Sequence, residues 1–212
     1  MNINRRLIKF SSTFILFLIF IASSLLVNND IFRQYDYQSM MAVHEVSHSF
    51  IDYFFSYFSI IGSSEITFAI ILIVFGYFFF VKKKFVLSVF LYILIYPFEL
   101  LGKLLIYHPK PPTFLNRYVF DFHFPSSFIV ETSYSYPSGH MARTAFVISL
   151  LFLLIRNSSI NKIKKNFYFL FLASYFLIMF LSRIYLGEHW FTDVVGGTLL
   201  GVAVAFLSYA LW

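Results

Sequence analysis

Six long apolar stretches constrain the fold of this sequence more than any other feature. They run approximately over residues 7–27, 60–81, 85–105, 141–155, 167–186 and 193–212. A helix that crosses a bilayer needs about 20 predominantly apolar residues. The fourth stretch is short, so we expect that helix to begin at Pro137 or Ser138. The sequence therefore predicts an all-α, polytopic membrane protein with about six transmembrane helices, in a single domain over residues 1–212.

The composition excludes a soluble globular protein. Hydrophobic residues make up 59% of the chain and charged residues only 12%, whereas soluble domains carry about 25% charged residues. So few charges leave too little polar surface to cover a particle in water. The sequence also lacks cysteine, which excludes disulfides and thiolate metal sites. Basic residues precede the first apolar stretch as in a signal peptide, but the stretch is long for one, and we expect a retained anchor.

The basic residues are unevenly distributed and indicate the orientation of the chain. Three short polar segments carry basic residues and no acidic ones; they contain Arg5, Arg6 and Lys9, then Lys82, Lys83 and Lys84, then Arg156, Lys162, Lys164 and Lys165. Lys and Arg accumulate in short cytoplasmic loops, so both termini are expected in the cytoplasm. The segments 28–59, 108–136 and 187–192 are then outside, and all six histidines lie on this side or at its edge. The net charge of +6 thus reflects membrane topology, and we expect no nucleic-acid partner. The chemistry is expected to face the extracytoplasmic side of the cell membrane.

A histidine and an aspartate in the last outer segment have the spacing of a nucleophile and its orienting partner. His189 and Asp193 are four residues apart, so one helical turn places them on the same face. A carboxylate behind an imidazole fixes the tautomer and raises the basicity of the ring, which leaves the other nitrogen free to attack. Single histidines near a membrane surface are commonly structural, so this pair alone does not establish catalysis.

Two further clusters at outer helix ends suit a phosphate. Ser138 and Gly139 lie at an expected helix start, where free backbone N–H groups and the helix dipole form an anion site. His140 beside them can protonate a leaving oxygen. Cations at the outer membrane edge are costly unless paired or functional, and these cations are Lys103, Lys110 and Arg183. Glu99, one turn before Lys103, offers a structural explanation for that lysine, but three clusters that all suit one anion favour function.

These residues together resemble the signature of the type 2 phosphatidate phosphatase superfamily, which also includes vanadium haloperoxidases and glucose-6-phosphatase. The first block of that signature is a lysine, six residues and Arg-Pro, here residues 103–111. The second is Pro-Ser-Gly-His, matched at residues 137–140. The third is Ser-Arg, five residues, His, three residues and Asp, matched without a gap at residues 182–193. The six-span layout extends the resemblance from these blocks to the whole chain.

One position departs from the family pattern. Lys110 stands where the family has an arginine, and it offers a point charge in place of a planar, bidentate fork. The cation is kept while its geometry is looser, which bears on efficiency and substrate preference more than on the reaction. Arg117 and Arg143 are candidates to supply the missing fork.

The resemblance implies a reaction and a set of site residues. It implies a phosphatase without metal or cofactor that acts on a lipid phosphate or polyprenyl diphosphate, among membrane lipids, through a phospho-histidine intermediate. His189 would be the nucleophile, Asp193 its orienting partner, and His140 the general acid and base. The phosphate oxygens would be held by Lys103, Lys110, Ser138, Gly139 and Arg183. A lipid phosphotransferase would use the same residues, so the sequence leaves the acceptor open, together with the head group and the oligomeric state.

A second motif favours a different enzyme. The run His44-Glu45-Val46-Ser47-His48 fits the His-Glu-x-x-His pattern of zinc proteases, in which two histidines on one helix face bind zinc and the glutamate acts as base. The candidates for a third ligand are Asp36, His123 and Glu131. Alternatively, residues 38–58 form an amphipathic helix on the outer membrane face, where histidines are unremarkable. A channel, transporter or structural protein would need only the spans, and the intact His189–Asp193 pair argues against it.

Overall fold

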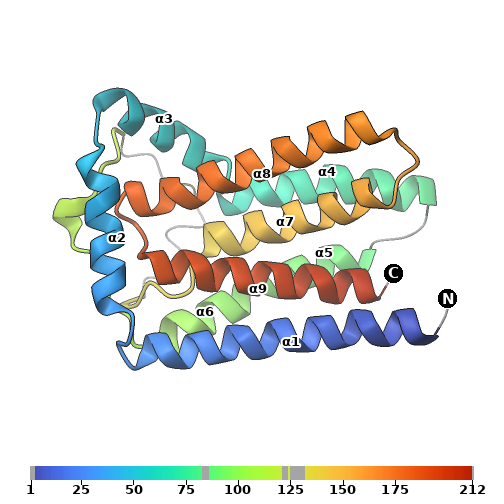
Figure 1. The fold of residues 1–212 in the computed structure, drawn as a ribbon, viewed down its shortest axis with the longest axis horizontal. Helices are drawn as coiled ribbons and strands as arrows, with labels where there is room; N and C mark the ends of the chain where they lie inside the picture. The colour runs from blue at the N-terminus through green and yellow to red at the C-terminus, as the bar shows by residue number, and fades with distance from the viewer. Residues whose placement is uncertain (1–2, 83–85, 121–123, 125–131, 212) are drawn as a thin grey trace.

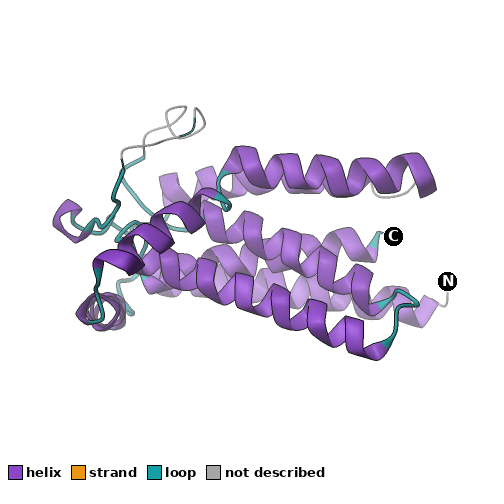
Figure 2. Cartoon of the chain, turned by 90° about the horizontal axis from the view of Figure 1, so that it is seen from above, coloured by secondary structure: helices purple, strands orange, loops and turns teal. Residues whose placement is uncertain are grey.

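The computed structural model of this chain describes residues 3–82, 86–120, 124 and 132–211, which form a bundle of helices (Figure 1). The helices are α1 (Ile3–Asn28), α2 (Arg33–Glu45), α3 (Ser49–Ile60), α4 (Ser64–Lys82), α5 (Val86–Ile93), α6 (Ile95–Leu105), α7 (Gly139–Arg156), α8 (Lys162–Tyr185) and α9 (Phe191–Ala210), and a 3-10 turn η1 (Thr113–Leu115) follows α6. The described residues contain no strand, and their one isolated β-bridge joins Pro109 to Tyr134. Figure 2 shows the same helices from above.

Five segments of the described chain are long and apolar enough to cross a membrane. They are Leu7–Asn28, Leu87–Leu105, Gly139–Arg156, Lys162–Tyr185 and Phe191–Ala210. A sixth span results if α3 and the first part of α4, which meet at a bend of 51°, are counted as one broken span. The predicted all-α membrane fold with about six spans is therefore confirmed. The fourth expected helix begins at Gly139, directly after Ser138.

The outer segment after α1 differs from the expectation of one amphipathic helix over residues 38–58. α2 ends at Glu45 and α3 begins at Ser49. His48 between them is extended, with φ −149° and ψ 143°, and its Nδ1 accepts a hydrogen bond of 3.2 Å from the backbone N–H of Phe50. A side chain that caps a helix start satisfies a backbone N–H that has no partner within the helix. The prediction of one continuous helix was therefore wrong, because His48 starts a second one.

α7 and α9 pack closely because glycines of α9 face the backbone of α7. A Cβ atom at Gly197 would collide with the carbonyl oxygen of Ser138, and one at Gly201 would collide with that of Ala142. Small residues spaced by four allow two helices to approach this closely. The contact therefore fixes where α7 begins relative to the first turns of α9.

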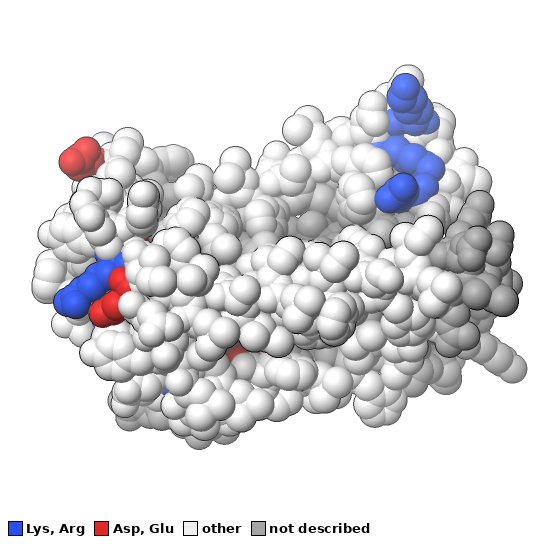
Figure 3. Space-filling view, turned by 60° about the horizontal axis from the view of Figure 1, so that its bottom comes forward, with Lys and Arg blue, Asp and Glu red and all other residues white. Residues whose placement is uncertain are grey.

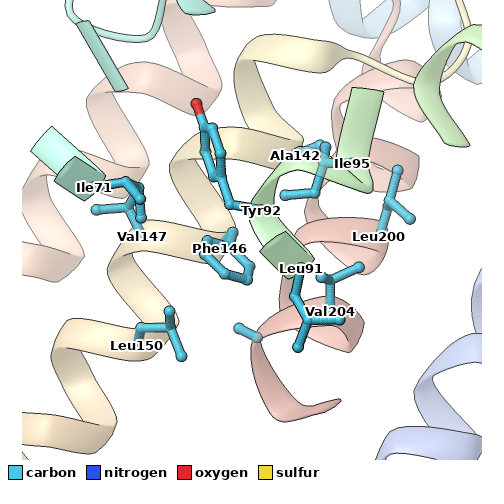
Figure 4. Packing of buried hydrophobic residues seen from close by; sticks show 11 residues of the cluster. Ile71, Leu91, Tyr92, Ile95, Ala142, Phe146, Val147, Leu150, Leu200 and Val204 are labelled. Carbon is cyan, nitrogen blue, oxygen red and sulfur yellow. The ribbon is translucent and has the colours of Figure 1, made fainter. Parts of the chain in front are cut away.

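A buried hydrophobic cluster beside this contact joins α7 and α9 to α4 and α5 (Figure 4). Phe146 and Leu150 of α7 lie in it together with Val204 of α9. Tyr92 of α5 is also fully buried, and its hydroxyl lies 2.6 Å from the hydroxyl of Thr67. The one polar atom of this side chain is thus satisfied within the core, as a buried hydroxyl requires.

The two ends of the bundle differ in content. Both termini lie at one end, and α2 and α3 lie at the other (Figure 1). On the face drawn in Figure 3, the charged side chains of the described residues gather towards the two ends, and the broad middle is almost entirely uncharged. An uncharged middle between charged ends is the surface that a lipid bilayer requires, because charges near its centre are costly.

Candidate functional site

The residues predicted to carry the chemistry lie at the end of the bundle opposite the termini (Figure 1). Lys103 is in the last turn of α6, Gly139 begins α7, and Arg183 is in the last turn of α8. His189 lies in the short connection from α8 to α9, and Asp193 is in the first turn of α9. Residues that are up to 90 positions apart in the sequence are thus brought to one end of the molecule by four helix ends.

His189 and Asp193 form the buried pair that their spacing predicted, although His189 lies before the start of α9 and not on a helical turn with Asp193. Nδ1 of His189 lies 3.3 Å from Oδ2 of Asp193, and the two residues are 8% and 0% exposed. The same carboxylate oxygen accepts a hydrogen bond of 3.0 Å from the backbone N–H of Trp190, which holds the carboxylate at the start of α9. Because Nδ1 faces Asp193, Nε2 is the ring nitrogen left for reaction.

Burial and neighbouring cations keep the imidazole of His189 neutral. Its pKa lies well below the usual value of 6.5, first because burial disfavours the charged ring and then because Arg183, Lys103 and Arg143 repel a further positive charge. The same three cations act on His140. The two histidines therefore share one positively charged environment, which attracts an anion to both.

Glu99 joins two cations of the site beside the start of α7. Its carboxylate lies 2.8 Å from Nζ of Lys103 and 2.7 Å from Nη1 of Arg143. The carboxylate also abuts Gly139, where a Cβ atom would collide with its oxygens. The ion pair with Lys103 is the one expected from the sequence. Because Glu99 also binds Arg143, this candidate for the missing arginine fork shares one carboxylate with Lys103 beside the start of α7.

Ser138 precedes α7 and presents a hydroxyl that suits an anion. The residue is fully buried, and its Oγ has no hydrogen-bond partner among the residues that the structure describes. Its backbone N–H donates to the carbonyl oxygen of Asp193 over 2.9 Å, which ties the start of α7 to the first turn of α9. A buried hydroxyl that lacks a partner calls for an explanation, and a phosphate oxygen at this helix N-terminus would supply one.

Arg183 is fully buried and is held by residues that the sequence reasoning missed. Its Nη1 donates to the hydroxyl of Tyr118 over 3.0 Å, and its guanidinium forms an ion pair with Glu188. The Tyr118 hydroxyl lies 2.8 Å from the hydroxyl of Ser59. Glu188 is adjacent to His189 and could have been suspected from its place in the third block. Tyr118 gave no signal, because one tyrosine in an aromatic-rich segment does not indicate its partner.

Two predicted cations lie outside this network. The side chain of Lys110 is exposed, and it makes no hydrogen bond or ion pair with the described part of the chain. Arg117 lies 3.6 Å from Asp52 and stacks over the ring of Tyr185 at 5.7 Å. Arg117, the other candidate for the missing arginine fork, is thus engaged beside α3.

The His-Glu-x-x-His motif does not form the two-histidine face that a zinc protease needs. His44 is in the last turn of α2, and its Nε2 lies 3.0 Å from the carbonyl oxygen of Tyr185. His48 belongs to the start of α3, where its ring caps the helix. The break between α2 and α3 therefore removes the helical spacing on which the zinc hypothesis depended.

The candidates for a third zinc ligand give no support to that hypothesis. Asp36 accepts hydrogen bonds of 2.8 Å from the backbone N–H and from the hydroxyl of Thr192. His123 and Glu131 lie outside the described residues. Within the described ranges, no group of three His, Asp or Glu side chains is arranged to hold a metal ion.

A second buried polar cluster adjoins Asp193 and was not predicted as part of the site. Nε2 of His108 lies 3.4 Å from Oδ1 of Asp193 and 3.6 Å from Oδ2 of Asp36. His108 falls within the first signature block, but the block pattern leaves its position undefined. Asp36 lies in a different outer segment, so only the fold could show this contact.

Comparison with known proteins identifies a family. The family model described as the PAP2 superfamily matches residues 84–212. Phosphatidylglycerophosphatase B of Bacillus subtilis (strain 168) is 38% identical over 79 residues, which cover 36% of this chain and 38% of that protein. The aligned part thus spans well under two thirds of the length of this relative.

Two solved structures share the fold. The crystal structure of the first transmembrane PAP2 type phosphatidylglycerolphosphate phosphatase from Bacillus subtilis superimposes with a TM-score of 0.74 at 22% identity and covers 94% of both chains. The crystal structure of LpxE from Aquifex aeolicus superimposes with a TM-score of 0.54 at 22% identity, covering 81% of this chain and 93% of that one. At this identity the likeness shows the fold alone, and in the first case the fold extends over nearly the whole chain.

Proposed function

Because this chain belongs to the PAP2 superfamily, we propose that it is a multi-pass membrane phosphatase that hydrolyses a lipid phosphate or polyprenyl diphosphate through a phospho-histidine at His189. The observation that carries the proposal is the buried His189–Asp193 pair, in which Nδ1 faces the carboxylate, Nε2 is left for reaction, and Arg183 and Lys103 act electrostatically on the ring. The names of its relatives favour phosphatidylglycerophosphate. The other candidate substrates are phosphatidate, undecaprenyl diphosphate and a lipid A phosphate.

The reaction has two steps, each of which needs one proton transfer. In the first, Nε2 of His189 attacks phosphorus, so that a P–N bond forms while the P–O bond to the leaving group breaks; the leaving group is the lipid alkoxide of a monophosphate or the lipid phosphate of a diphosphate. His140 gives its proton to the departing oxygen, and Asp193 stabilises the positive charge that the attacking ring gains. In the second, His140 takes a proton from water, whose oxygen attacks phosphorus. The P–N bond then breaks, releasing inorganic phosphate and neutral His189.

The protonated state of His140 in the first step follows from the charge of the substrate. Arg183, Arg143 and Lys103 act electrostatically on the ring in the free protein. A bound phosphate offsets these cations and lets the ring carry the proton that it donates. Substrate binding thus prepares the general acid.

The transferring phosphoryl group needs positive charge around its equatorial oxygens, where transition-state charge is spread. We assign this role to Lys103, Lys110, Arg183, the Ser138 hydroxyl and the Gly139 backbone N–H. In the free protein, Lys103 is paired with Glu99 and Arg183 with Glu188, so the phosphate joins or displaces these carboxylates. These cations and N–H groups supply the positive charge that stabilises the transition state, and the proposed reaction therefore does not require a metal ion.

The side and the route of substrate entry follow from the distribution of charge. The basic residues that mark cytoplasmic loops include Lys9 near the start of α1 and the run from Arg156 to Lys165 between α7 and α8. These positions lie at the end that holds the termini, opposite the site (Figure 1). The site is therefore assigned to the extracytoplasmic side, at a depth that a lipid phosphate can reach sideways from the outer leaflet.

Phosphate release by detergent-purified protein tests the proposed function. The panel comprises the four candidate lipids, each assayed with and without EDTA and with His189→Ala. Release that persists in EDTA and is lost in a folded H189A protein is expected. Activity that EDTA abolishes would contradict the metal-independent mechanism, and activity retained in H189A would remove the nucleophile. Transfer of phosphate to an added lipid alcohol, with no free phosphate, would identify a phosphotransferase instead.

A further inference from the structure

Behind the His189–Asp193 pair lies a buried group of side chains for which the proposed reaction has no role. Nε2 of His108 lies 3.2 Å from Oγ1 of Thr192, 3.4 Å from Oδ1 of Asp193 and 3.6 Å from Oδ2 of Asp36. His108 is 5% exposed and Asp36 is 2% exposed. One ring nitrogen thus faces oxygens from α2 and α9, and one of these oxygens belongs to the residue that orients the nucleophile.

These contacts select the tautomer of His108. The Thr192 hydroxyl donates to Asp36 over 2.8 Å, so towards His108 it can only accept. Both carboxylates accept when they are ionised. With three acceptors around Nε2, the proton of the neutral ring must lie on Nε2 and point into the space between them. Of the three oxygens, Oγ1 of Thr192 is the one in hydrogen-bond contact with Nε2, at 3.2 Å. Oδ1 of Asp193 lies 3.4 Å from the same nitrogen and has no hydrogen-bond partner among the described residues, while Oδ2 of the same carboxylate faces His189.

The backbone around His108 is held firmly enough to aim this donor. Its carbonyl oxygen accepts from the backbone N–H of Ser135 over 3.0 Å. The carbonyl oxygen of the next residue, Pro109, accepts from Nε1 of Trp190 over 2.7 Å. Trp190 is also the residue whose backbone N–H binds Asp193. The segment that carries His108 is thus fixed to the loop that carries the nucleophile.

We propose that His108 is a positioning residue of the reaction, which acts through Asp193 by holding Oδ1 so that Oδ2 stays directed at Nδ1 of His189. Asp36 completes the chain, because it binds both Thr192 donors and faces the same nitrogen of His108. The buried His189–Asp193 pair is thereby extended to a row of alternating imidazole and carboxylate groups, in the order His189, Asp193, His108 and Asp36. The inference rests on the proposed function, since it assigns His108 to the same nucleophile.

A purely structural role for this cluster makes a different prediction. Asp36 binds the backbone N–H and the hydroxyl of Thr192 near the start of α9, so it also anchors α2 to α9. If anchoring were the whole role, any polar side chain of similar size at position 108 would serve. If Nε2 matters, only a side chain that reaches the position of Nε2 can replace the histidine.

Two amide variants separate these possibilities. The side-chain amide of His108→Gln reaches the position of Nε2, whereas that of His108→Asn reaches only the position of Nδ1. The control is Tyr136→Phe, which removes a buried hydroxyl 3.0 Å from Ser24 of α1, on a ring that packs edge-on against His108 at 6.4 Å. The assay measures kcat and KM for phosphate release and thermal unfolding in detergent, alongside wild type and His189→Ala.

We expect H108Q to keep kcat within about threefold of wild type. H108N should lower kcat about tenfold or more, which is the scale of one lost interaction with a charged group, and should leave KM within about twofold. Y136F should keep the wild-type kcat. Equal kcat in H108Q and H108N, or a loss that follows thermal stability alone across the three variants, would overturn the proposal. If H108N does not fold, Asp36→Asn is tested in its place, because it alters the carboxylate whose Oδ2 faces Nε2 of His108. A wild-type kcat in D36N would also overturn the proposal. An inactive wild type, or an active H189A, would refute the proposed function instead.

Discussion

Replacing Asp193 with asparagine tests the orienting pair with the smallest change in shape. The carboxylate lies 3.3 Å from Nδ1 of His189 and faces the positive charge that the ring gains when Nε2 bonds to phosphorus. At that distance, with an effective dielectric constant of about 20, the attraction between two unit charges is about 5 kcal/mol. A tenfold change in rate corresponds to about 1.4 kcal/mol, so Asp193→Asn should lower kcat about 10³-fold to 10⁴-fold.

The assay for this variant separates a loss of chemistry from a loss of binding or of folding. Because the cations that hold the phosphate are unchanged, KM should stay within about threefold of wild type. The matched control is Asp52→Asn, which makes the same chemical change on α3, where Asp52 accepts a 2.6 Å hydrogen bond from Tyr185. That variant should keep kcat within about twofold. A folded D193N protein with kcat within about tenfold of wild type would refute the role assigned to the carboxylate.

Two further predictions concern the charge of the nucleophile and the packing of the site. Burial and the neighbouring cations hold the pKa of His189 well below 6.5, so the ring stays unprotonated as the pH falls. We therefore expect no loss of kcat/KM, corrected for the ionisation of the substrate, between pH ~7.5 and pH ~6; a loss with a half-maximal point at pH 6.5 or higher would contradict this. At Gly197 a Cβ atom would collide with the carbonyl oxygen of Ser138, whereas at Gly76 it would meet nothing within 4 Å. Gly197→Ala should therefore lower the free energy of unfolding by about 1–3 kcal/mol and reduce activity. Gly76→Ala should leave activity unchanged and raise the free energy of unfolding by at most about 1 kcal/mol. Equal melting temperatures and equal activities of the two variants would show that the close α7–α9 contact determines neither stability nor activity.

The spans could be predicted from the sequence because their signal is local. A run of apolar residues long enough to cross a bilayer is visible without any knowledge of its neighbours, and the start of α7 at Gly139 follows from a short run and a preceding Pro-Ser pair. The break between α2 and α3 could not be predicted in this way. It depends on which backbone N–H the ring of His48 satisfies, and the hydrophobic pattern does not carry that information.

The same distinction holds within the site. Glu99 and Lys103 are four residues apart within α6, so helical geometry predicted their contact. His189 and Asp193 have the same spacing and also meet, although His189 precedes α9 and is not part of the helix. The bond between Glu99 and Arg143 crosses from α6 to α7, and that between Arg183 and Tyr118 crosses from α8 to the segment after η1. Contacts between elements depend on tertiary packing, which one sequence does not specify residue by residue.

His108 is the clearest example of a site residue whose contacts could not be predicted from the sequence. The first signature block is defined by its ends, Lys103 and Lys110-Pro111, and leaves position 108 between them undefined. Asp36 was considered only as a zinc ligand. The packing of α2 against the start of α9 gives both residues a different significance, because it brings them to the far side of the Asp193 carboxylate.

The central claim is that His189 forms a covalent bond to phosphorus, and rapid-quench labelling tests it most directly. Wild-type protein is mixed with a lipid phosphate that carries labelled phosphorus, stopped at times shorter than one turnover, and digested to locate the label. We expect an acid-labile label on His189 that forms and decays at rates consistent with kcat, and no label in His189→Ala. Normal turnover with no labelled protein at any time, or a label on another residue, would contradict the account.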